Sequence, residues 1–435
     1  MPSTSSRSDT LPSSEGLSRR AAMACDQPIS YLMHKALAHP ELISLAAGFV
    51  DQQSLPVDFT REALDWIMSD AHRARAALQY GTTHGYLPLR EALLSRLLAD
   101  DGTSQAEQNV TPEQIVVTAG SNQFLHLLAD VLFDPGDIVL CTSPTYLVYL
   151  GVLQSAGVRA IGVEADSDGM IPESLESQLA RLDATGELAR VKAIYIVSYF
   201  DNPTNVTLSV ERRPQIVELA RRWSHQGRIH VIEDAAYREL RYDAVDIPSL
   251  RAFDSEGDTV ILAQTFSKSF SPGIRVGWGV LPEHLVEPLC YLKGNCDFGS
   301  PNFAQHLMSA VLEAGLYDPH LQLLRTEYRT KLQAMLSAAD EYLGPLPGVS
   351  WLKPQGGLYV WLTVPEGIDT GTDSKLFDLA IEEGMLYVPG AYCYPADGQE
   401  VPRNTIRLSF GVQSPERIRQ GMAALARSIE RVQRA

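Results

Sequence analysis

The sequence has few cysteines, and nothing in their spacing suggests that they form pairs. They number five, they are scattered, and no two lie in a CxxC motif: Cys25, Cys141, Cys290, Cys296 and Cys393. This arrangement argues against a disulfide framework and against a zinc site. No apolar run approaches the length of a membrane span, and the N-terminus lacks the charged start and apolar stretch of a signal peptide. We therefore expect a cytoplasmic protein that does not span a membrane.

Positive charge is also scarce. The 53 acidic residues outnumber the 36 Lys and Arg residues, which gives a formal net charge of −17. Such an acidic excess opposes nonspecific attraction to nucleic acid or to anionic lipid. It does not exclude small anionic substrates, because these respond to local charge.

The length of 435 residues favours two domains, since one small core cannot organise so long a chain. Residues 1–16 are rich in Ser, Pro and Thr, which predicts a disordered leader. We predict that 17–50 is the N-terminal segment of a smaller domain, that 51–320 forms the large domain, and that 321–435 completes the smaller, α+β domain.

Short apolar strands alternate with amphipathic helices from residue 115 onward, which is typical of βαβ units around a parallel sheet. The predicted strands are 115–118, 138–141, 159–163, 193–197, 229–233, 260–263 and 275–280. The fold class is therefore α/β, with a mostly parallel seven-stranded sheet covered by helices. Further helices are predicted at 29–38, 59–76, 87–98, 302–314, 320–343, 374–383 and from 415. Further strands are predicted at 42–46 and 405–410, with two more around 354–361.

Lys268 lies on the loop that leaves the sixth predicted strand, within the stretch TFSKSFSPGIRVGW. Loops at the C-terminal ends of parallel strands are where α/β proteins build their sites. A lysine in such a loop can form a Schiff base with a carbonyl, while Ser267 and Arg275 can hold an anion such as phosphate. An aldehyde that also carries a phosphate describes pyridoxal 5'-phosphate. A solvated surface loop that contains Lys and Arg is the alternative.

Two other strand ends carry polar residues that suit the same ligand. Ser121, Asn122 and Gln123 open a helix after the first predicted strand, where free N–H groups and the helix dipole favour an anion. A simple N-cap explains these residues equally well. Tyr146 follows the second predicted strand and could stack on a planar cofactor, or could be a rim or core residue.

Asp234 closes the fifth predicted strand, whose apolar run indicates burial. An unpaired buried carboxylate is costly, so Asp234 needs a cation. A protonated pyridine nitrogen would serve, and so would a salt bridge to Arg238 or Arg241. Tyr237 could share the phenolic oxygen of the cofactor with Asn202. Asn202 lies in an Asn-Pro turn, and turn formation alone would also explain an asparagine there.

Arg407 stands within an otherwise apolar predicted strand. An inward-facing guanidinium needs a carboxylate, which its fork binds through two hydrogen bonds. If the strand lies at a sheet edge, Arg407 faces water instead.

In their order along the chain, these stretches resemble the fold-type I pyridoxal-phosphate aminotransferases of class I and II, especially the aminoadipate and kynurenine branch. The resemblance runs from about Ile43 to the C-terminus. Its motifs are YGxxxGYxPLRE at 80–91, NPTG at 202–205, ED..Y at 233–237 and SFSK…PGxRxGW up to 278. Asn205 replaces the usual glycine, and Ala235 and Ala236 replace bulkier residues, which could widen the pocket.

The resemblance implies an aspartate-aminotransferase-like fold and a role for each site residue. Lys268 would bind the cofactor as a Schiff base and move a proton to and from the substrate, Asp234 would keep the pyridine nitrogen protonated, and Tyr237 would bond the phenolic oxygen. The implied cofactor-binding residues are Ser121, Asn122, Gln123, Tyr146, Asn202, Asp234, Tyr237, Ser267, Lys268, Arg275 and, from the neighbouring subunit of a homodimer with shared sites, Tyr80. The implied substrate-binding residues are Gly48, Asn202 and Arg407.

The activity implied by the resemblance is transfer of the amino group of an L-amino acid to a 2-oxo acid such as 2-oxoglutarate. The same residues also suit a pyridoxal-phosphate lyase. Aminotransferase-like transcription regulators carry a winged-helix module ahead of this fold, and the leader before Leu17 is too short for one. No GxGxxG follows a predicted strand, which argues against a nicotinamide dehydrogenase.

The N-terminal helix bears on the donor. Aminoadipate-type relatives have an arginine there, within an Ile-Arg-Glu-Leu pattern, that meets the distal carboxylate. Here Ser30 stands in that position, next to Tyr31. We therefore predict neutral aromatic or aliphatic donors, unless Arg19 or Arg20 substitutes for the missing arginine.

Overall fold

The computed structural model describes residues 16–24, 28–46 and 48–434. The predicted leader lies outside the described residues except for Gly16. Two main sheets and one two-stranded pair make up the β-structure of the described chain. No helix in the described ranges has the length and apolar character that crossing a bilayer requires.

The larger sheet has eight strands in the order β2-β9-β8-β7-β6-β3-β4-β5. Strands β3, β4, β6, β7 and β8 are joined by parallel pairings, whereas β9 and β5 run antiparallel to their neighbours. The strands are β2 (Ile115–Thr118), β3 (Ile138–Ser143), β4 (Arg159–Asp166), β5 (Gly169–Met170), β6 (Val191–Val197), β7 (His230–Asp234), β8 (Val260–Thr265) and β9 (Gly277–Val280). The predicted α/β class and mostly parallel sheet are confirmed, and β5 is the one strand added to the seven predicted.

Helices cover both faces of this sheet, so its strands are buried on both sides. Along β3 the side chains alternate between two apolar cores: Val139 and Cys141 join one, and Ile138 and Leu140 join the other. The helices of this part are α5 (Leu87–Asp101), α6 (Gln105–Gln108), α7 (Ser121–Leu132), α8 (Leu147–Ser155), α9 (Pro172–Ala184), α10 (Arg212–Arg222), α11 (Glu283–Asp297) and α12 (Asn302–Glu313). Short 3-10 turns span Pro112–Gln114, Leu188–Arg190, Leu250–Phe253, Pro272–Ile274 and Gly390–Cys393.

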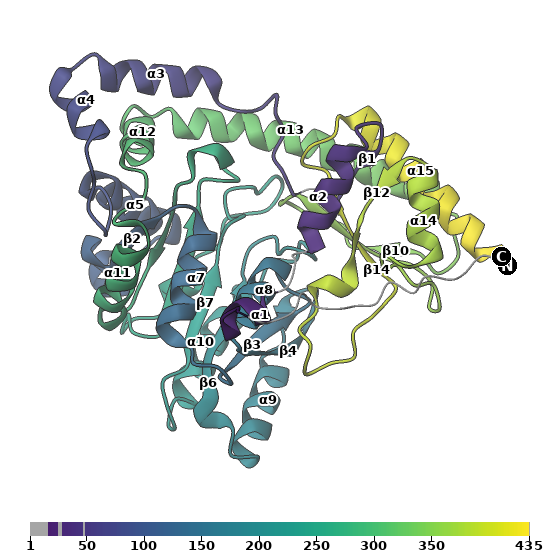
Figure 1. Cartoon of the computed structure of the whole chain (residues 1–435), viewed down its shortest axis with the longest axis horizontal. Helices are drawn as coiled ribbons and strands as arrows, with labels where there is room; N and C mark the ends of the chain where they lie inside the picture. Colours follow the sequence, from purple (N-terminus) through teal and green to yellow (C-terminus); the bar gives the residue numbers. More distant parts are fainter. Residues whose placement is uncertain (1–15, 25–27, 47, 435) are drawn as a thin grey trace.

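The smaller sheet has the order β10-β11-β14-β13, and β1 pairs in parallel with β12 beside it. Its strands and helices are β1 (Ile43–Ser44), β10 (Ser350–Trp351), β11 (Tyr359–Thr363), β12 (Met385–Leu386), β13 (Val388–Pro389), β14 (Thr405–Ser409), α14 (Lys375–Glu382) and α15 (Pro415–Gln433). Helix α13 (Tyr317–Ala338), in green in Figure 1, spans the distance between the two parts and continues into a π-helical turn at Ala339–Leu343. Strand β1, from the N-terminal segment, thus pairs with a C-terminal strand. Two helices precede β1 along the chain, α1 (Arg19–Met23) and α2 (Pro28–Ala38).

One predicted helix is wrong in its extent. The segment predicted as a single helix at 59–76 forms α3 (Val57–Met68) and α4 (Ala71–Leu78). Asp70 ends the first helix by capping the second, because its side chain accepts a hydrogen bond from Arg73 N at 2.8 Å. The two strands expected around 354–361 are β10 and β11, which pair with each other, and β11 begins only at Tyr359, after Gly357 with a φ of +65°.

Candidate active site

A cavity of about 160 Å³ lies at the C-terminal edge of the larger sheet, where β6, β7 and β8 end against the start of α7. It is lined by Ser121, Asn122, Tyr146, Val197, Asn202, Asp234, Ala236, Tyr237, Thr265, Ser267, Lys268, Pro272 and Arg275. Most of the side chains that the sequence predicts for the site therefore meet here. The parallel sheet explains their meeting, since it brings the carboxyl ends of its strands to one edge.

Lys268 lies in the turn that follows β8. Its Nζ donates a hydrogen bond to the carbonyl of Gly48 at 2.7 Å. Burial lowers the pKa of this amine below its ordinary value. A lysine with a lowered pKa is more often unprotonated at neutral pH, which makes it a better nucleophile. Gly48 has no room for a side chain, because a Cβ there would lie 2.6 Å from the Tyr359 hydroxyl.

The end of the cavity near α7 is built for an anion. Ser121 is the first residue of α7, so the unpaired N–H groups and the dipole of the helix point toward this end. Arg275 donates to the carbonyl of Ala119 at 3.0 Å and lies 3.5 Å from Ser267 Oγ. Gly120 has a φ of +85°, and a Cβ there would lie 2.5 Å from Arg275 Nη2. The geometry therefore gathers a guanidinium, two serine hydroxyls and a helix start.

Asp234 closes β7 and also lines the cavity. Its carboxylate accepts hydrogen bonds from Tyr195 Oη at 3.0 Å and from Ala236 N at 3.2 Å. The alternative salt bridge is wrong: Arg238 pairs with Asp101 and Asp246, Arg241 pairs with Glu239 and Asp246, and no ion pair to Asp234 occurs in the described chain. Burial raises the pKa of Asp234 to about 6. A cation placed against this carboxyl would lower its pKa and stabilise the charged form, as a protonated pyridine nitrogen does.

Two tyrosines that the sequence analysis did not single out support these residues. Tyr195 contacts Asp234 as described, and Tyr359 Oη lies 3.1 Å from Tyr237 Oη. A tyrosine in a buried apolar strand needs a hydrogen-bond partner for its hydroxyl, so the position of Tyr195 in such a strand could have indicated its contact with a polar group. Tyr146 donates to Asn122 Oδ1 at 3.3 Å from the N-terminal end of α8.

Arg407 lies on β14 and is buried, with only 2% of its surface exposed. It donates to Asn202 Oδ1 and to the carbonyl of Ala46, both at 2.8 Å, and stands over the Tyr359 ring at 4.5 Å. Its Nε has no hydrogen-bond partner among the described residues, which also supply no carboxylate. The alternative that Arg407 faces water is wrong, because its side chain is buried and β14 lies between β11 and β13 and not at the sheet edge. A buried guanidinium without an anion is suited to binding one.

The remaining predicted residues lie outside this cavity. Gln123 accepts from Ala119 N at 2.7 Å and donates to Asp297 at 2.8 Å, so its amide braces the loop before α7. Tyr80 is 83% exposed, and its ring meets Phe298 edge-on.

The departure at Asn205 has a structural consequence. Its φ is +64°, a value that asparagine tolerates better than most residues. Its side-chain amide donates to the carbonyls of Gly356, at 2.9 Å, and Tyr359. Asn205 therefore ties the turn after β6 to the start of β11, which a glycine could not do.

Asp234→Asn is expected to stabilise the ligand-free protein above about pH 6. The folded-state pKa of about 6 lies above the ordinary value of 3.8, so the cost of burying the charge is absent below about pH 4, grows from pH 4 to 6, and is complete above pH 6. Two pH units correspond to about 3 kcal/mol, and the change of acceptor for Tyr195 offsets part of this. Urea unfolding should give the variant about 1–3 kcal/mol more stability at pH 7.5, with the difference vanishing toward pH 4. Parallel pH profiles for the two proteins would contradict the burial cost.

Comparison with known proteins agrees with this geometry. Residues 40–425 match the family described as aminotransferase class I and II. Aromatic-amino-acid aminotransferase 1 of Thermococcus litoralis is 34% identical and aligns over 91% of this chain and 90% of its own. The kynurenine aminotransferase of Pyrococcus horikoshii, solved in complex with PMP, superposes with a TM-score of 0.88 at 34% identity, covering 97% of this chain and 98% of its own. The α-aminoadipate aminotransferase of Thermus thermophilus, complexed with N-(5'-phosphopyridoxyl)-L-leucine, gives a TM-score of 0.83 at 30% identity, covering 98% of this chain and 100% of its own.

Proposed function

Because the chain belongs to the class I and II aminotransferases and is therefore a pyridoxal-phosphate-dependent transaminase, we propose that it transfers the amino group of a neutral L-amino acid to a 2-oxo acid such as 2-oxoglutarate. The observation that carries the proposal is the meeting of Lys268, Asp234 and the anion-binding end in one cavity, with Arg407 bonded to Asn202 in its wall. The similar proteins named above are aminotransferases, which does not favour the lyase alternative.

The cavity residues fit the cofactor on chemical grounds. When bound, pyridoxal phosphate supplies an aldehyde that condenses with amines and a protonated ring that accepts electrons from the substrate's Cα. The buried carboxyl of Asp234 suits the ring nitrogen, and the start of α7 with Arg275 suits the phosphate. We assign the ring face to Tyr146 and the phenolic oxygen to Asn202 and Tyr237. The phosphate is assigned to Ser121, Asn122, Ser267 and Arg275, with Gln123 bracing the loop beside them.

Lys268 is the residue proposed to move the proton. Its buried amine has a lowered pKa and is held near the cavity by the carbonyl of Gly48. Once freed from the cofactor by an incoming amino acid, Lys268 can take a proton from the substrate's Cα as a general base. An amine whose pKa lies closer to neutrality does this more readily than an exposed lysine.

Arg407 is proposed to bind the α-carboxylate of the substrate. The guanidinium is buried, lacks an anionic partner in the described chain and is oriented by Asn202 Oδ1 and the carbonyl of Ala46. Arg407 uses only the oxygen of the Asn202 side chain, so within the described ranges the Nδ2 amide is left to donate to a ligand. A carboxylate bound here is charge-paired in a site of low dielectric constant, where such a pair is strong.

We further propose a cytoplasmic homodimer in which Tyr80 reaches the phosphate of the partner's site. Tyr80 is exposed and does not line the cavity of its own chain. It lies instead on a surface hollow of about 710 Å³ that Trp66 and Arg73 also line. Exposed apolar residues gather in this region, including Trp66, Leu78, Leu87 and Phe298. Clustered apolar exposure of this kind favours a protein–protein contact.

The neutral donor is proposed from the N-terminal helix. Ser30 is exposed on α2 in the position of the aminoadipate-type arginine, beside the half-exposed Tyr31. Arg20 is already paired with Asp130 at 2.7 Å and bonded to His126, so it does not fit the role of a substitute. Without a cation at Ser30, a distal carboxylate loses a charge-assisted partner.

Leucine, methionine and phenylalanine are expected to give kcat/KM values roughly ten- to a hundredfold above those of 2-aminoadipate and glutamate. The measurement is a donor panel with 2-oxoglutarate and pyruvate as acceptors. Ser30→Arg should raise kcat/KM for 2-aminoadipate, whereas the matched neutral variant Ser30→Gln should not. A parent enzyme that prefers 2-aminoadipate would refute the neutral-donor proposal and make Arg19 the next residue to replace.

A further inference from the structure

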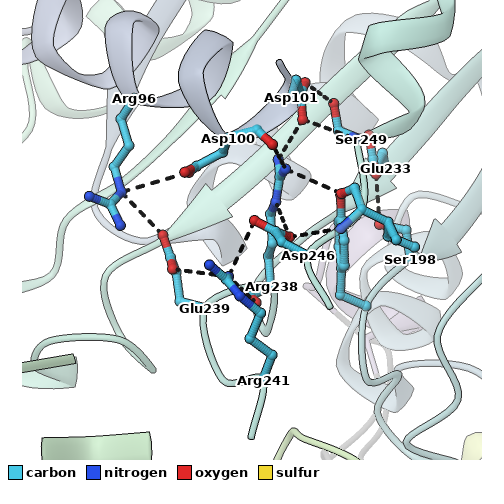
Figure 2. Close-up of polar contacts among 12 residues, drawn as sticks. Arg96, Asp100, Asp101, Ser198, Glu233, Arg238, Glu239, Arg241, Asp246 and Ser249 are labelled. Carbon is cyan, nitrogen blue, oxygen red and sulfur yellow. Dashed lines mark hydrogen bonds and ion pairs between the residues drawn. The ribbon is translucent and has the colours of Figure 1, made fainter. Parts of the chain in front are cut away.

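A buried network of polar side chains lies behind the turn that follows β7 (Figure 2). Its centre is Arg238, which directly follows Tyr237 and is 2% exposed. Arg238 Nη1 donates to Asp101 Oδ1 at 2.7 Å, and Nε donates to Asp246 Oδ1 at 3.2 Å. Its Nη2 donates to two backbone carbonyls, at 3.0 and 3.2 Å. Every nitrogen of the guanidinium therefore has a partner, and these contacts restrain the side chain.

Asp101 is a fixed anchor for this arginine. It is the last residue of α5 and its side chain is fully buried. Besides Arg238, its carboxylate accepts from Ser249 N at 2.9 Å, from Ser249 Oγ at 2.6 Å and from Gln108 Nε2 at 2.9 Å. Both oxygens are thus engaged, so the position of the carboxylate is set by α5 and by the 3-10 turn after Ser249.

The turn itself is short and internally bonded. Arg238 N donates to the carbonyl of Ala235 at 3.2 Å, and Leu240 N donates to the carbonyl of Tyr237 at 2.8 Å. The Tyr237 side chain lines the cavity, whereas that of Arg238 enters the network. Because the two residues are adjacent in one bonded turn, fixing the guanidinium restricts the direction of the tyrosine.

The other end of the turn is held in the same way. Glu233 precedes Asp234 on β7, and successive side chains of a strand point to opposite faces. Glu233 accepts from Ser198 Oγ at 2.7 Å and pairs with Arg213 at 3.2 Å, with both charged side chains fully buried. Asp234, on the other face, lines the cavity. Glu233, which precedes Asp234, and Arg238, which follows Tyr237, are therefore both held by buried hydrogen bonds and ion pairs.

We propose that Arg238 and Asp101 are positioning residues, which hold the Tyr237 hydroxyl where it meets the phenolic oxygen of the cofactor. Burying an ion pair costs desolvation that offsets most of its attraction, so its net contribution to stability is small. Its effect here is to select one direction for the turn. This inference rests on the role proposed above for Tyr237.

The test is a double variant that removes both charges. Arg238→Met alone leaves Asp101 charged and unpaired, so it is expected to destabilise the protein strongly. Asp101→Asn with Arg238→Met avoids the unpaired charge, so its unfolding midpoint should lie between those of Arg238→Met and the parent. The readout is the pH at which the visible absorbance of the bound cofactor changes. Weakening one hydrogen bond to the phenolic oxygen should raise that pH by about 0.5–1 unit.

Tyr237→Phe supplies the reference and should give a comparable or larger shift. A triple variant that combines all three substitutions should shift the absorbance change little more than Tyr237→Phe alone does, because both sets of changes act on the same hydrogen bond. A matched control is Arg251→Met with Asp254→Asn. The two charged groups of this pair are also buried and lie 2.9 Å apart. Asp254, however, accepts from the amides of Thr259 and Val260 at the start of β8, and Lys268 follows the other end of that strand. The control should leave the absorbance change where it is in the parent.

The two ways to fail are distinguishable. If Tyr237→Phe shifts the absorbance change and the Asp101/Arg238 variant does not, the network does not position the tyrosine and the inference is overturned. If Tyr237→Phe itself causes no shift, the proposed role of Tyr237 is wrong, and this inference is overturned with it.

Discussion

Lys268→Ala is expected to lower turnover by at least about four orders of magnitude while the protein stays folded. The change removes the amine that we assign both to covalent attachment of the cofactor and to proton transfer. The side chain borders a cavity, and among the described residues its Nζ makes one hydrogen bond, to Gly48, so truncation leaves the packing intact. Turnover of a good amino donor, circular dichroism and the visible spectrum after removal of free cofactor measure the three parts of this expectation.

A control lysine separates this effect from a general loss of charge. Lys192 lies at the N-terminal end of β6, whereas the cavity lies at the C-terminal end, and its side chain is partly exposed. Lys192→Ala should therefore keep full activity. If the washed Lys268→Ala protein retained both the visible absorbance band and turnover, Lys268 would not be the attachment site.

Arg407→Leu is expected to lower kcat/KM for amino acids by roughly 10²–10³-fold, because the substrate carboxylate loses a charge-assisted, two-point partner. Stability should not fall, since the variant removes a buried cation that has no anionic partner in the described chain. Arg407→Lys should lie between the two, because an ammonium retains the charge without the fork.

A substrate without a carboxylate tests the cause of that loss. In single-turnover reactions the parent should react with phenylalanine far faster than with 2-phenylethylamine, and Arg407→Leu should remove most of this difference. Equal losses for the amine and the amino acid would mean that Arg407 acts on the fold of the site and does not bind the carboxylate.

The larger sheet could be predicted closely from the sequence because its strands are buried on both faces. Runs such as Val260 to Ala263 are continuously apolar, and the structure places strands at all seven predicted positions. The break between α3 and α4 was missed because a helical pattern of apolar residues continues across Ser69 and Asp70. There the local cap formed by Asp70 outweighs the periodicity.

Most of the predicted residues that line the cavity could be found because they stand at or shortly after a strand end, or at a helix start. Their supports could not, since these depend on contacts between distant segments. Tyr359 meets Tyr237 across 122 positions, and Asp101 meets Arg238 across 137. Strand alternation alone left the orientation of Arg407 undecided, and the burial of its side chain against Asn202 and Ala46 resolved it.

Reduction of the cofactor-loaded protein with borohydride, followed by peptide mapping, tests directly whether Lys268 is the residue that binds the cofactor. Reduction makes the bond between the cofactor and its lysine permanent, so the mass of a phosphopyridoxyl group marks the attachment site. We predict that this mass appears on the peptide that contains Lys268 and on no other lysine. A label on a different lysine, or full loading with no label at Lys268, would contradict this prediction.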